Sequence, residues 1–353
     1  MLGGTLFIMQ SKNPEISVII IARNQKDTIS MCLESVLKLE HDNYEVIVVD
    51  DCSEDGTAAI AEKLPVQLIR LDKHQGAASA RNRGAECACG ETLFFLDSDV
   101  VVEKNALSQI ASAFHDFPSA QAVQGVYTRD SMPKNLVTRY RDYFDDYKNQ
   151  GVESDLVKVV STYCFAIKKQ VFSDLGGFDA RIPQATVEDN DLGYRLFTSG
   201  HTVVRNRHLA VTHLKSYSLK SLLKRDYIVS FNMVKFFLRA KLQAGWNGRQ
   251  GIPLSSGEKT NATFAASIAL SFGAFIFGIL WALSGFTEYY AILFLALMLA
   301  LILINSKFLF SLVKARGWRF CFVWVSIFYL DMLIASLGLV SGGIDFFVFK
   351  RRY

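Results

Sequence analysis

The chain has 353 residues, of which 50% are hydrophobic, and a formal net charge of +4. This length exceeds one ordinary domain, and the small net charge excludes a protein that binds nucleic acid through a strongly basic face. The six cysteines have the spacing of neither a disulfide framework nor a zinc site, so we expect reduced thiols. Residues 1–15 have no basic start and only a short apolar patch, and we interpret them as an N-terminal extension, not a signal peptide.

Buried strands alternate with helices in the first hundred residues. Continuous apolar runs predict strands at residues 16–22, 45–49, 66–71 and 92–96. Helical patterns lie between them, at residues 29–37, 57–63 and 77–87. This alternation predicts an α/β fold with a parallel, doubly wound sheet, whose ligands bind beyond the carboxyl ends of the strands.

The pattern is looser after Pro118. We expect strands near 122–127 and 159–167, and a helix that begins near Glu188. This second half completes a cleft, so that one domain extends over residues 16–218.

A basic amphipathic segment follows at 219–261. Its helical apolar stripe runs from Leu219 to Phe237, and Lys220, Lys224, Lys235 and Arg239 lie away from that stripe. A helix of this kind, placed just before hydrophobic segments, indicates a position on anionic membrane lipid. The alternative is the solvated face of an ordinary helix.

Residues 262–353 contain three apolar stretches, at about 263–284, 289–312 and 320–342, each long enough to cross a bilayer. The first link between them has no lysine or arginine, whereas the second has three. This asymmetry predicts a multi-pass protein of the cytoplasmic membrane with its first domain in the cytoplasm.

Three full spans would leave Lys350, Arg351 and Arg352 on the outer side, against the tendency of basic residues to stay inside. Gly338, Gly342 and Gly343 offer a place where the last helix would break and turn back. We expect three spans, because the last stretch is long enough. Asp331 should then face other helices or a polar cavity, since a charge facing lipid is costly.

Carboxylates follow two of the predicted strands. Asp97 and Asp99 come directly after the strand at 92–96, where two acids at i and i+2 can share one divalent cation that keeps positions open for diphosphate oxygens. The alternative is a solvated turn. Asp51 ends the second strand and can accept a hydrogen bond from a ribose hydroxyl or a base imide, although the residues after it are typical of a turn.

Other polar side chains are candidates for the same site. Arg81 lies on a helix of small residues and can reach a diphosphate, or can simply be a surface arginine. Glu188 and Asp189 are expected at a helix start from the dipole alone, but a hydroxyl acceptor also requires a base, and no other acidic cluster in the second half is as well placed. His213, at the end of a short strand, can add a third metal ligand.

With these motifs in place, the chain resembles the inverting family-2 glycosyltransferases of the GT-A fold, followed by C-terminal transmembrane helices. Six segments carry the resemblance in order: 17–24 (SVIIIARN), 48–53 (VVDDCS), 80–84 (ARNRG), 95–99 (FLDSD), 176–179 (GGFD) and 188–189 (ED). The resemblance implies that Ala22, Asn24 and Asp51 surround the nucleotide. It also implies that Asp97 and Asp99 bind metal and diphosphate, and that Asp189 is the general base.

The implied activity is transfer of a sugar from a nucleotide-diphosphate-sugar donor to a lipid-linked or membrane-associated glycan acceptor, with Mn²⁺ or Mg²⁺, in cell-envelope or surface-polysaccharide synthesis. Two alternatives stay open: a polyprenyl-phosphate glycosyl synthase, and a membrane subunit that binds nucleotide-sugar without turnover. A dinucleotide-dependent oxidoreductase is excluded, because no glycine-rich turn follows the first strand. The Gln-x-x-Arg-Trp motif of processive synthases is also missing from the sequence.

Overall fold

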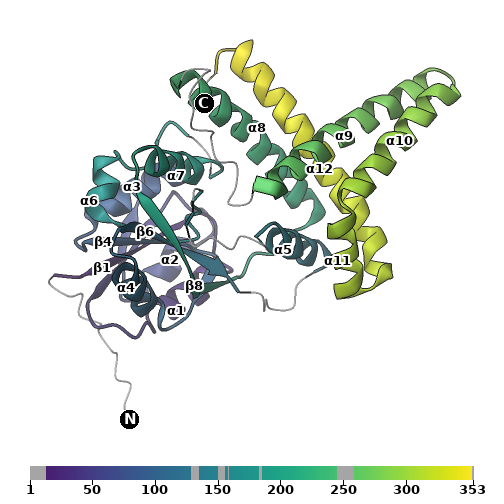
Figure 1. Cartoon of the computed structure of the whole chain (residues 1–353). Coiled ribbons are helices and arrows are strands. Elements are labelled where there is room, and N and C mark those ends of the chain that lie inside the picture. Colours follow the sequence, from purple (N-terminus) through teal and green to yellow (C-terminus); the bar gives the residue numbers. More distant parts are fainter. Residues whose placement is uncertain are drawn as a thin grey trace. The chain divides into compact units, whose positions relative to one another are not determined.

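The computed structural model describes residues 13–128, 135–149, 156–157, 159–182, 185–244 and 258–351. The chain divides into two compact units (Figure 1). The first contains Met1–Pro133 and Glu153–Lys215, and the second contains Lys134–Val152 and Ser216–Tyr353. The sequence did not predict that residues 134–152 belong with the C-terminal region. Most of the expected N-terminal extension lies outside the described residues.

The first unit is built on one eight-stranded sheet of order β3-β2-β1-β4-β7-β6-β8-β5. Its first four strands are parallel, as predicted: β1 (Ile16–Ala22), β2 (Tyr44–Asp50), β3 (Gln67–Arg70) and β4 (Thr92–Asp97). They alternate with α1 (Ile29–Val36), α2 (Thr57–Ala61) and α3 (Ala77–Cys87). Ala22 is in register with Asp50, and Ile21 with Asp97, so the carboxyl ends of these strands meet at one edge of the sheet.

The other half of the sheet, for which the sequence predicted no strand direction, makes the sheet mixed. β7 (Cys164–Lys168) pairs antiparallel with β4, and β6 (Ala120–Tyr127) pairs antiparallel with β7. β8 (Thr202–His213) is parallel to β6, and β5 (Val100–Val102) is antiparallel to β8. Three further helices belong to this unit: α4 (Ala106–Asp116), α6 (Lys169–Asp174) and α7 (Glu188–Thr198). The strand expected at 159–167 begins only at Cys164.

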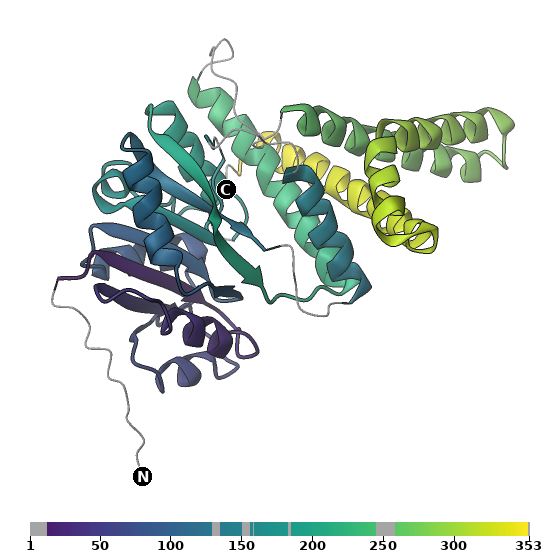
Figure 2. The same cartoon turned by 60° about the horizontal axis from the view of Figure 1, so that its bottom comes forward.

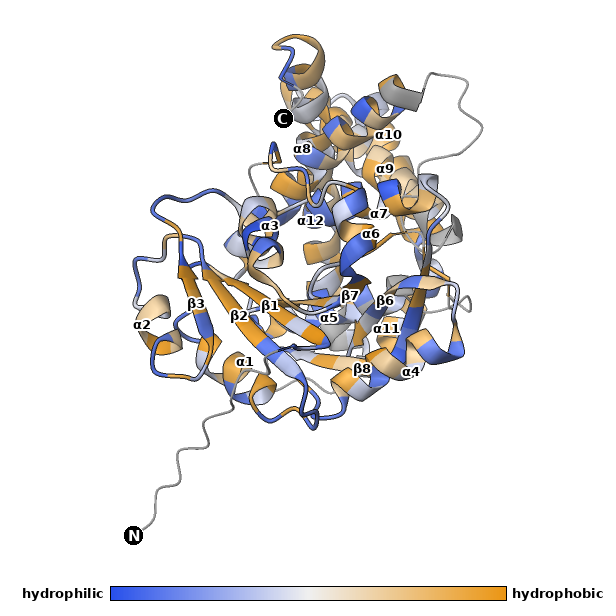
Figure 3. Cartoon of the chain, turned by 90° about the vertical axis from the view of Figure 1, so that its left-hand side faces the viewer, coloured by the Kyte–Doolittle hydropathy of each residue, from blue (hydrophilic) through white to orange (hydrophobic). Residues whose placement is uncertain are grey.

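Both faces of the sheet are covered, which explains the continuous apolar runs of its strands (Figure 3). Val18 and Ile20 pack in the core on one face, and Ile19 packs in the core on the other. Helix α3 lies close to this second face, because a Cβ at Gly84 would come within 2.5 Å of the Ile19 side chain. The small residues of α3 therefore permit its close packing on the sheet.

The second unit is helical (Figures 1 and 2). It contains α5 (Leu136–Asn149), α8 (Leu219–Ala244), α9 (Glu258–Leu283), α10 (Glu288–Ile304), α11 (Ser306–Arg316) and α12 (Trp318–Phe347). By length and composition, two helical segments are able to cross a membrane, Ala262–Leu283 and Phe322–Phe347. Helices α10 and α11 qualify together as a third, although the pair is bent by 62°. The apolar stretches expected from the sequence are thus helices. The number of times that the chain crosses the membrane stays a prediction.

Both acids of α12 have polar partners on other helices of this unit. The Tyr140 hydroxyl of α5 donates a hydrogen bond of 3.1 Å to Oδ2 of Asp331, which confirms that this aspartate faces other helices. Lys235 of α8 is buried and forms an ion pair of 2.8 Å with Asp345 of α12. Lys235 therefore does not lie on the outward basic face expected for α8. Helix α12 is continuous through Gly338 and Gly342, where the sequence offered a break.

Candidate active site

The acidic residues predicted to bind the donor lie at the sheet edge formed by the carboxyl ends of β1, β2 and β4. Asp97 is the last residue of β4, and its side chain is 34% exposed. Asp99 follows two residues later and is buried. Asp51 comes directly after β2, and its backbone N–H donates to the carbonyl of Ala22 at the end of β1 over 2.9 Å. The structure therefore brings the predicted acids to one edge.

Arg81 connects this edge to the start of α7. Its Nη2 lies 2.9 Å from Oδ1 of Asp97, and its Nη1 lies 2.8 Å from Oε1 of Glu188. Both Arg81 and Glu188 are buried, and the guanidinium carbon lies 5.6 Å from the centre of the Phe178 ring. The Nε atom of this guanidinium has no hydrogen-bond partner among the described residues. Arg81 thus holds two carboxylates together, and the diphosphate contact expected for it stays a prediction.

Glu188, expected to bind substrate, is occupied by protein donors. Its Oε1 accepts a hydrogen bond from Nη1 of Arg81, and its Oε2 accepts one from the backbone N–H of Thr186 over 2.7 Å. A buried carboxylate with two charge-assisted hydrogen bonds is fixed in place. Glu188 therefore shapes the start of α7, where the next residue is Asp189.

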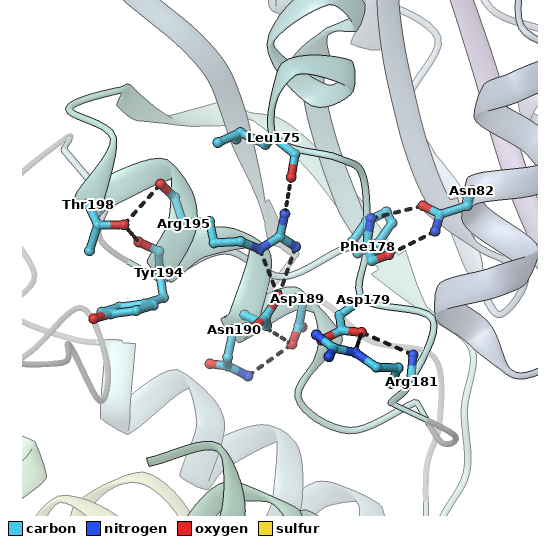
Figure 4. A network of polar contacts seen from close by, with 11 residues as sticks. Asn82, Leu175, Phe178, Asp179, Arg181, Asp189, Asn190, Tyr194, Arg195 and Thr198 are labelled. Atoms are coloured by element: carbon cyan, nitrogen blue, oxygen red, sulfur yellow. Dashed lines mark hydrogen bonds and ion pairs between the residues drawn. The ribbon is translucent and has the colours of Figure 1, made fainter. Parts of the chain in front are cut away.

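Asp189 is partly exposed beside this buried glutamate. Its Oδ1 accepts hydrogen bonds from the backbone and the side-chain nitrogen of Asn190, at 2.7 and 2.9 Å (Figure 4). Within the described ranges, its Oδ2 accepts none. Burial, and then the charge of Glu188, raise the pKa of Asp189 to about 8, against the lowering effect of Arg81. A carboxyl group with such a pKa suits a general base at neutral to mildly alkaline pH.

Asp97 and Asp99 respond differently to the same surroundings. Burial and the neighbouring charges of Asp99 and Glu188 raise the pKa of Asp97, although Arg81 opposes the shift. Burial would also raise the pKa of Asp99, but hydrogen bonding and charge from His213, with the charge of Lys215, bring it below its ordinary value. Asp99 is therefore the carboxylate of this pair that stays ionised most readily.

His213 lies next to Asp99, because it ends β8 in register with Val100 of β5. The His213 Nε2 is 3.7 Å from Oδ2 of Asp99, and the Lys215 Nζ is 3.8 Å from the same oxygen. The ring of Tyr127 stacks on that of Tyr163, with centroids 3.8 Å apart, and lies 4.9 Å from the His213 ring. The sequence reasoning missed Lys215, Tyr127 and Tyr163. Only the position of Lys215, two residues after His213, gave a signal.

Asp99 and His213 are close enough to each other to serve as two protein ligands of one divalent ion. Ligands of an octahedral ion, at about 2.1 Å from it, lie about 3 to 4 Å from one another, and Asp99 and His213 meet this range. No group of three or more His, Cys, Asp or Glu side chains in the described part of the chain is arranged to hold an ion. The predicted set of Asp97, Asp99 and His213 is therefore not a closed site. Its remaining positions suit diphosphate oxygens and water.

Asp51 holds the loop between β3 and α3 through hydrogen bonds to residues 74–76. Its carboxylate accepts the backbone N–H groups of Gln75 and Gly76, at 2.7 and 2.9 Å, and lies 2.7 Å from Nδ1 of His74. Asn24 performs a similar task nearby with φ +52°, since its Oδ1 accepts the N–H of Glu54. Both residues thus shape the loops around the expected nucleotide site. No sequence pattern had pointed to His74.

The loop before α7 is held by Asn82, the neighbour of Arg81 on α3. The Asn82 side chain donates to the carbonyl of Phe178 over 2.8 Å and accepts its N–H over 2.9 Å (Figure 4). Arg195 secures the same loop, because its Nη1 donates to the carbonyl of Leu175 over 2.7 Å. Helix α3 therefore positions both the loop and the start of α7.

Comparison with known proteins adds to this geometry. Residues 17–176 match the family model described as glycosyl transferase family 2. The chain is 40% identical over 102 residues to the succinoglycan biosynthesis protein ExoO of Rhizobium meliloti, which is 28% of this chain and 29% of that protein. It is 38% identical over 106 residues to the putative teichuronic acid biosynthesis glycosyltransferase TuaG of Bacillus subtilis, which is 29% of this chain and 42% of that protein. The chain thus spans less than half the length of these two relatives.

A solved structure shares the fold. The mannosyltransferase PcManGT of Pyrobaculum calidifontis, in complex with GDP-Man and Mn²⁺, aligns with a TM-score of 0.58 and 18% identity over 94% of this chain and 88% of that one. The likeness confirms the GT-A fold expected from the sequence motifs. Residues 17–176 thus match glycosyltransferase family 2, and they lie in a unit that has the GT-A fold.

Proposed function

We propose that this enzyme transfers a sugar from a nucleotide-diphosphate-sugar donor to a hydroxyl of a lipid-linked or membrane-associated glycan, with inversion at the anomeric carbon. The observation that carries the proposal is the Arg81 bridge. It joins Asp97, at the edge where donor is expected, to Glu188, the neighbour of Asp189. The acceptor class is supported by the apolar helices of the second unit and by relatives named for surface-polysaccharide synthesis.

Asp189 would act as the general base. Its Oδ2 removes the proton of the acceptor hydroxyl, whose oxygen attacks the anomeric carbon while the bond from that carbon to the diphosphate breaks. The nucleoside diphosphate leaves with the bonding electron pair. A single displacement of this kind inverts the anomeric configuration, and it needs no second nucleophile.

Asp99 and His213 would hold Mn²⁺ or Mg²⁺, with Asp97 beside them. A bound divalent ion neutralises charge that develops on the leaving diphosphate. Lys215 adds a positive charge at the same place, 3.8 Å from Asp99. Asp51 and Asn24 would order the loops that receive the nucleotide, near Ala22. We place the catalytic unit in the cytoplasm on the charge asymmetry of the links between the apolar stretches.

A donor screen with the purified protein tests the proposal, with release of nucleoside diphosphate as the readout. The product of the active donor is then analysed by NMR, and we expect the anomeric configuration opposite to that of the donor. Retention of configuration would contradict the single displacement. Absence of release with every donor, in the presence of Mn²⁺ and membrane acceptors, would favour a subunit without turnover.

An Asp189→Asn variant separates the two acceptor classes. A sugar hydroxyl needs the base, so we expect loss of turnover, whereas the exposed Asp174→Asn control retains it. A phosphate acceptor is already ionised and needs no base. Full activity of Asp189→Asn would therefore identify a polyprenyl-phosphate glycosyl synthase.

A further inference from the structure

Helices α8 and α12 lie side by side and run in the same direction. The Tyr227 carbonyl of α8 lies against Gly338 of α12, where an added Cβ would come within 2.5 Å of it. One turn further along each helix, the Phe231 carbonyl lies against Gly342. Lys235 and Asp345 form their ion pair after another turn. Each step advances both helices toward their C-terminal ends, so the packing is parallel.

Helix α8 is too highly charged on its surface to lie in hydrocarbon. Lys220, Lys224 and Lys241 are exposed along its length. Charged side chains facing lipid at the centre of a bilayer are costly, whereas lysines at the headgroup level gain from anionic lipid. Helix α8 therefore suits the membrane interface, on the side from which the chain leaves the catalytic unit at Lys215.

The parallel packing places the C-terminal part of α12 at the same depth as α8. The two acids of α12 each have a polar partner on another helix of the unit. Asp331 accepts the hydrogen bond of Tyr140, and Asp345 pairs with Lys235. A span that crossed the bilayer here would take the exposed lysines of α8 into hydrocarbon. We infer that the α8–α12 pair lies along the interface, and that only the α9–α10 hairpin crosses the bilayer.

The hairpin has the properties of two crossings. Its first helix offers the 22-residue apolar segment Ala262–Leu283, and α10 has 17 residues, or about 25 Å, close to the lower limit for a span. The chain bends by 62° after α10, at Asn305. The Asn305 Nδ2 donates to the Ser267 hydroxyl and to the Leu301 carbonyl, at 2.8 and 2.9 Å, which satisfies polar groups at this break.

This arrangement removes the charge conflict of a three-span chain. Two crossings return the chain to the side of the catalytic unit. Lys350 and Arg351, both exposed just after α12, then lie on that side with the lysines of α8. The tail now follows the tendency of basic residues to stay inside. The partner of the α8–α12 pair is the anionic headgroup layer of the membrane.

Three single-cysteine variants test the topology in a background with the native cysteines replaced: Lys350→Cys after α12, Phe286→Cys at the tip of the hairpin, and Lys63→Cys in the catalytic unit. All three positions are exposed. Each variant is first shown to remain in the membrane fraction, and is then treated with an impermeant maleimide in intact and in lysed cells.

In intact cells, we expect Lys350→Cys and Lys63→Cys to have the same accessibility to the reagent, and Phe286→Cys to have the opposite one. All three variants should be labelled after lysis. If Lys350→Cys groups with Phe286→Cys, helix α12 crosses the bilayer and the inference is overturned. The readout does not depend on transferase activity, so it stands apart from the proposed function.

Discussion

The Nη1 atom of Arg81 lies 2.8 Å from Oε1 of Glu188, although 107 residues separate them in the sequence. Because Nη2 of the same guanidinium lies 2.9 Å from Asp97, one buried side chain fixes the distance between the end of β4 and the start of α7. Removal of one partner from a buried ion pair leaves an uncompensated charge.

We therefore expect Arg81→Met to destabilise the protein by about 3 to 5 kcal/mol. Arg83→Met is the matched control on the same helix, since Arg83 is exposed and its ion-pair partner, Glu86, is exposed too. Thermal unfolding followed by circular dichroism should show a lower midpoint for Arg81→Met and no change for Arg83→Met. Equal midpoints for both variants would show that the bridge does not stabilise the fold.

The pH dependence of turnover should report Asp189. Its pKa is raised to about 8, so the group is protonated below that pH, and the base form increases as pH rises. We expect kcat/KM to rise with pH and to level off above about 8. Asp189→Asn should lose about 10²- to 10⁴-fold in kcat. A profile that is flat from pH 6 to 9 would argue against a base at this position.

The same shift has the opposite sign for stability. A carboxyl group whose pKa is raised in the folded state favours folding most at low pH, and that contribution is lost as pH rises from about 3.9 toward about 8. Unfolding midpoints of the wild type should therefore fall over this window relative to those of Asp189→Asn. Parallel curves for the two proteins would contradict the raised pKa.

Metal dependence should be concentrated at Asp99. Asp99→Asn is nearly isosteric but removes the charge next to His213 and Lys215, so we expect a folded protein with a lower unfolding midpoint and little turnover. Mn²⁺ binding in the presence of nucleoside diphosphate should weaken by at least about 10- to 100-fold, by analogy with changes near metal ligands. Calorimetric titration measures this, with the exposed Asp116→Asn as control. Full turnover in chelator would show that no metal is required.

Two neighbouring glycines test the loop that Asn82 holds. Gly176 and Gly177 both have a left-handed φ, of +75° and +69°. A Cβ at Gly176 would meet no atom within 4 Å, whereas one at Gly177 would lie 2.7 Å from Oδ1 of Asn82, which accepts the N–H of Phe178. Gly176→Ala should cost only the backbone strain of about 1 to 2 kcal/mol. Gly177→Ala should cost clearly more, as measured by thermal midpoints. Equal decreases in the thermal midpoints of the two variants would show that the loop shifts to accommodate a Cβ at Gly177.

A second glycine pair tests the packing of α12 on α8. A Cβ at Gly342 would meet the Phe231 carbonyl at too short a distance, but one at Gly343 would meet nothing within 4 Å. Gly343→Ala should stabilise α12 by up to about 1 kcal/mol through helix propensity. Gly342→Ala should lower the thermal midpoint in detergent. If both variants are stabilised, the two helices do not pack as described.

The sequence alone predicted the strands of the parallel half and the position of its acids, because a strand covered on both faces must be a continuous apolar run. The sequence also predicted that Asp331 faces other helices or a polar cavity, since a charge facing lipid is costly. Asp97 and Asp99 were predicted as site residues for a related reason. Polar residues that directly follow a buried apolar strand mark the edge of the sheet.

Only the tertiary structure decided which partners these residues have. The direction of β7, the place of α5 in the C-terminal unit, the burial of Lys235 and the donors on Asp51 all depend on residues far away in the sequence. An arginine such as Arg81 pairs equally well with any carboxylate or phosphate that is brought near it. Its role as a bridge therefore follows from the tertiary position of α3, from which the Arg81 side chain reaches both Asp97 at the end of β4 and Glu188 at the start of α7.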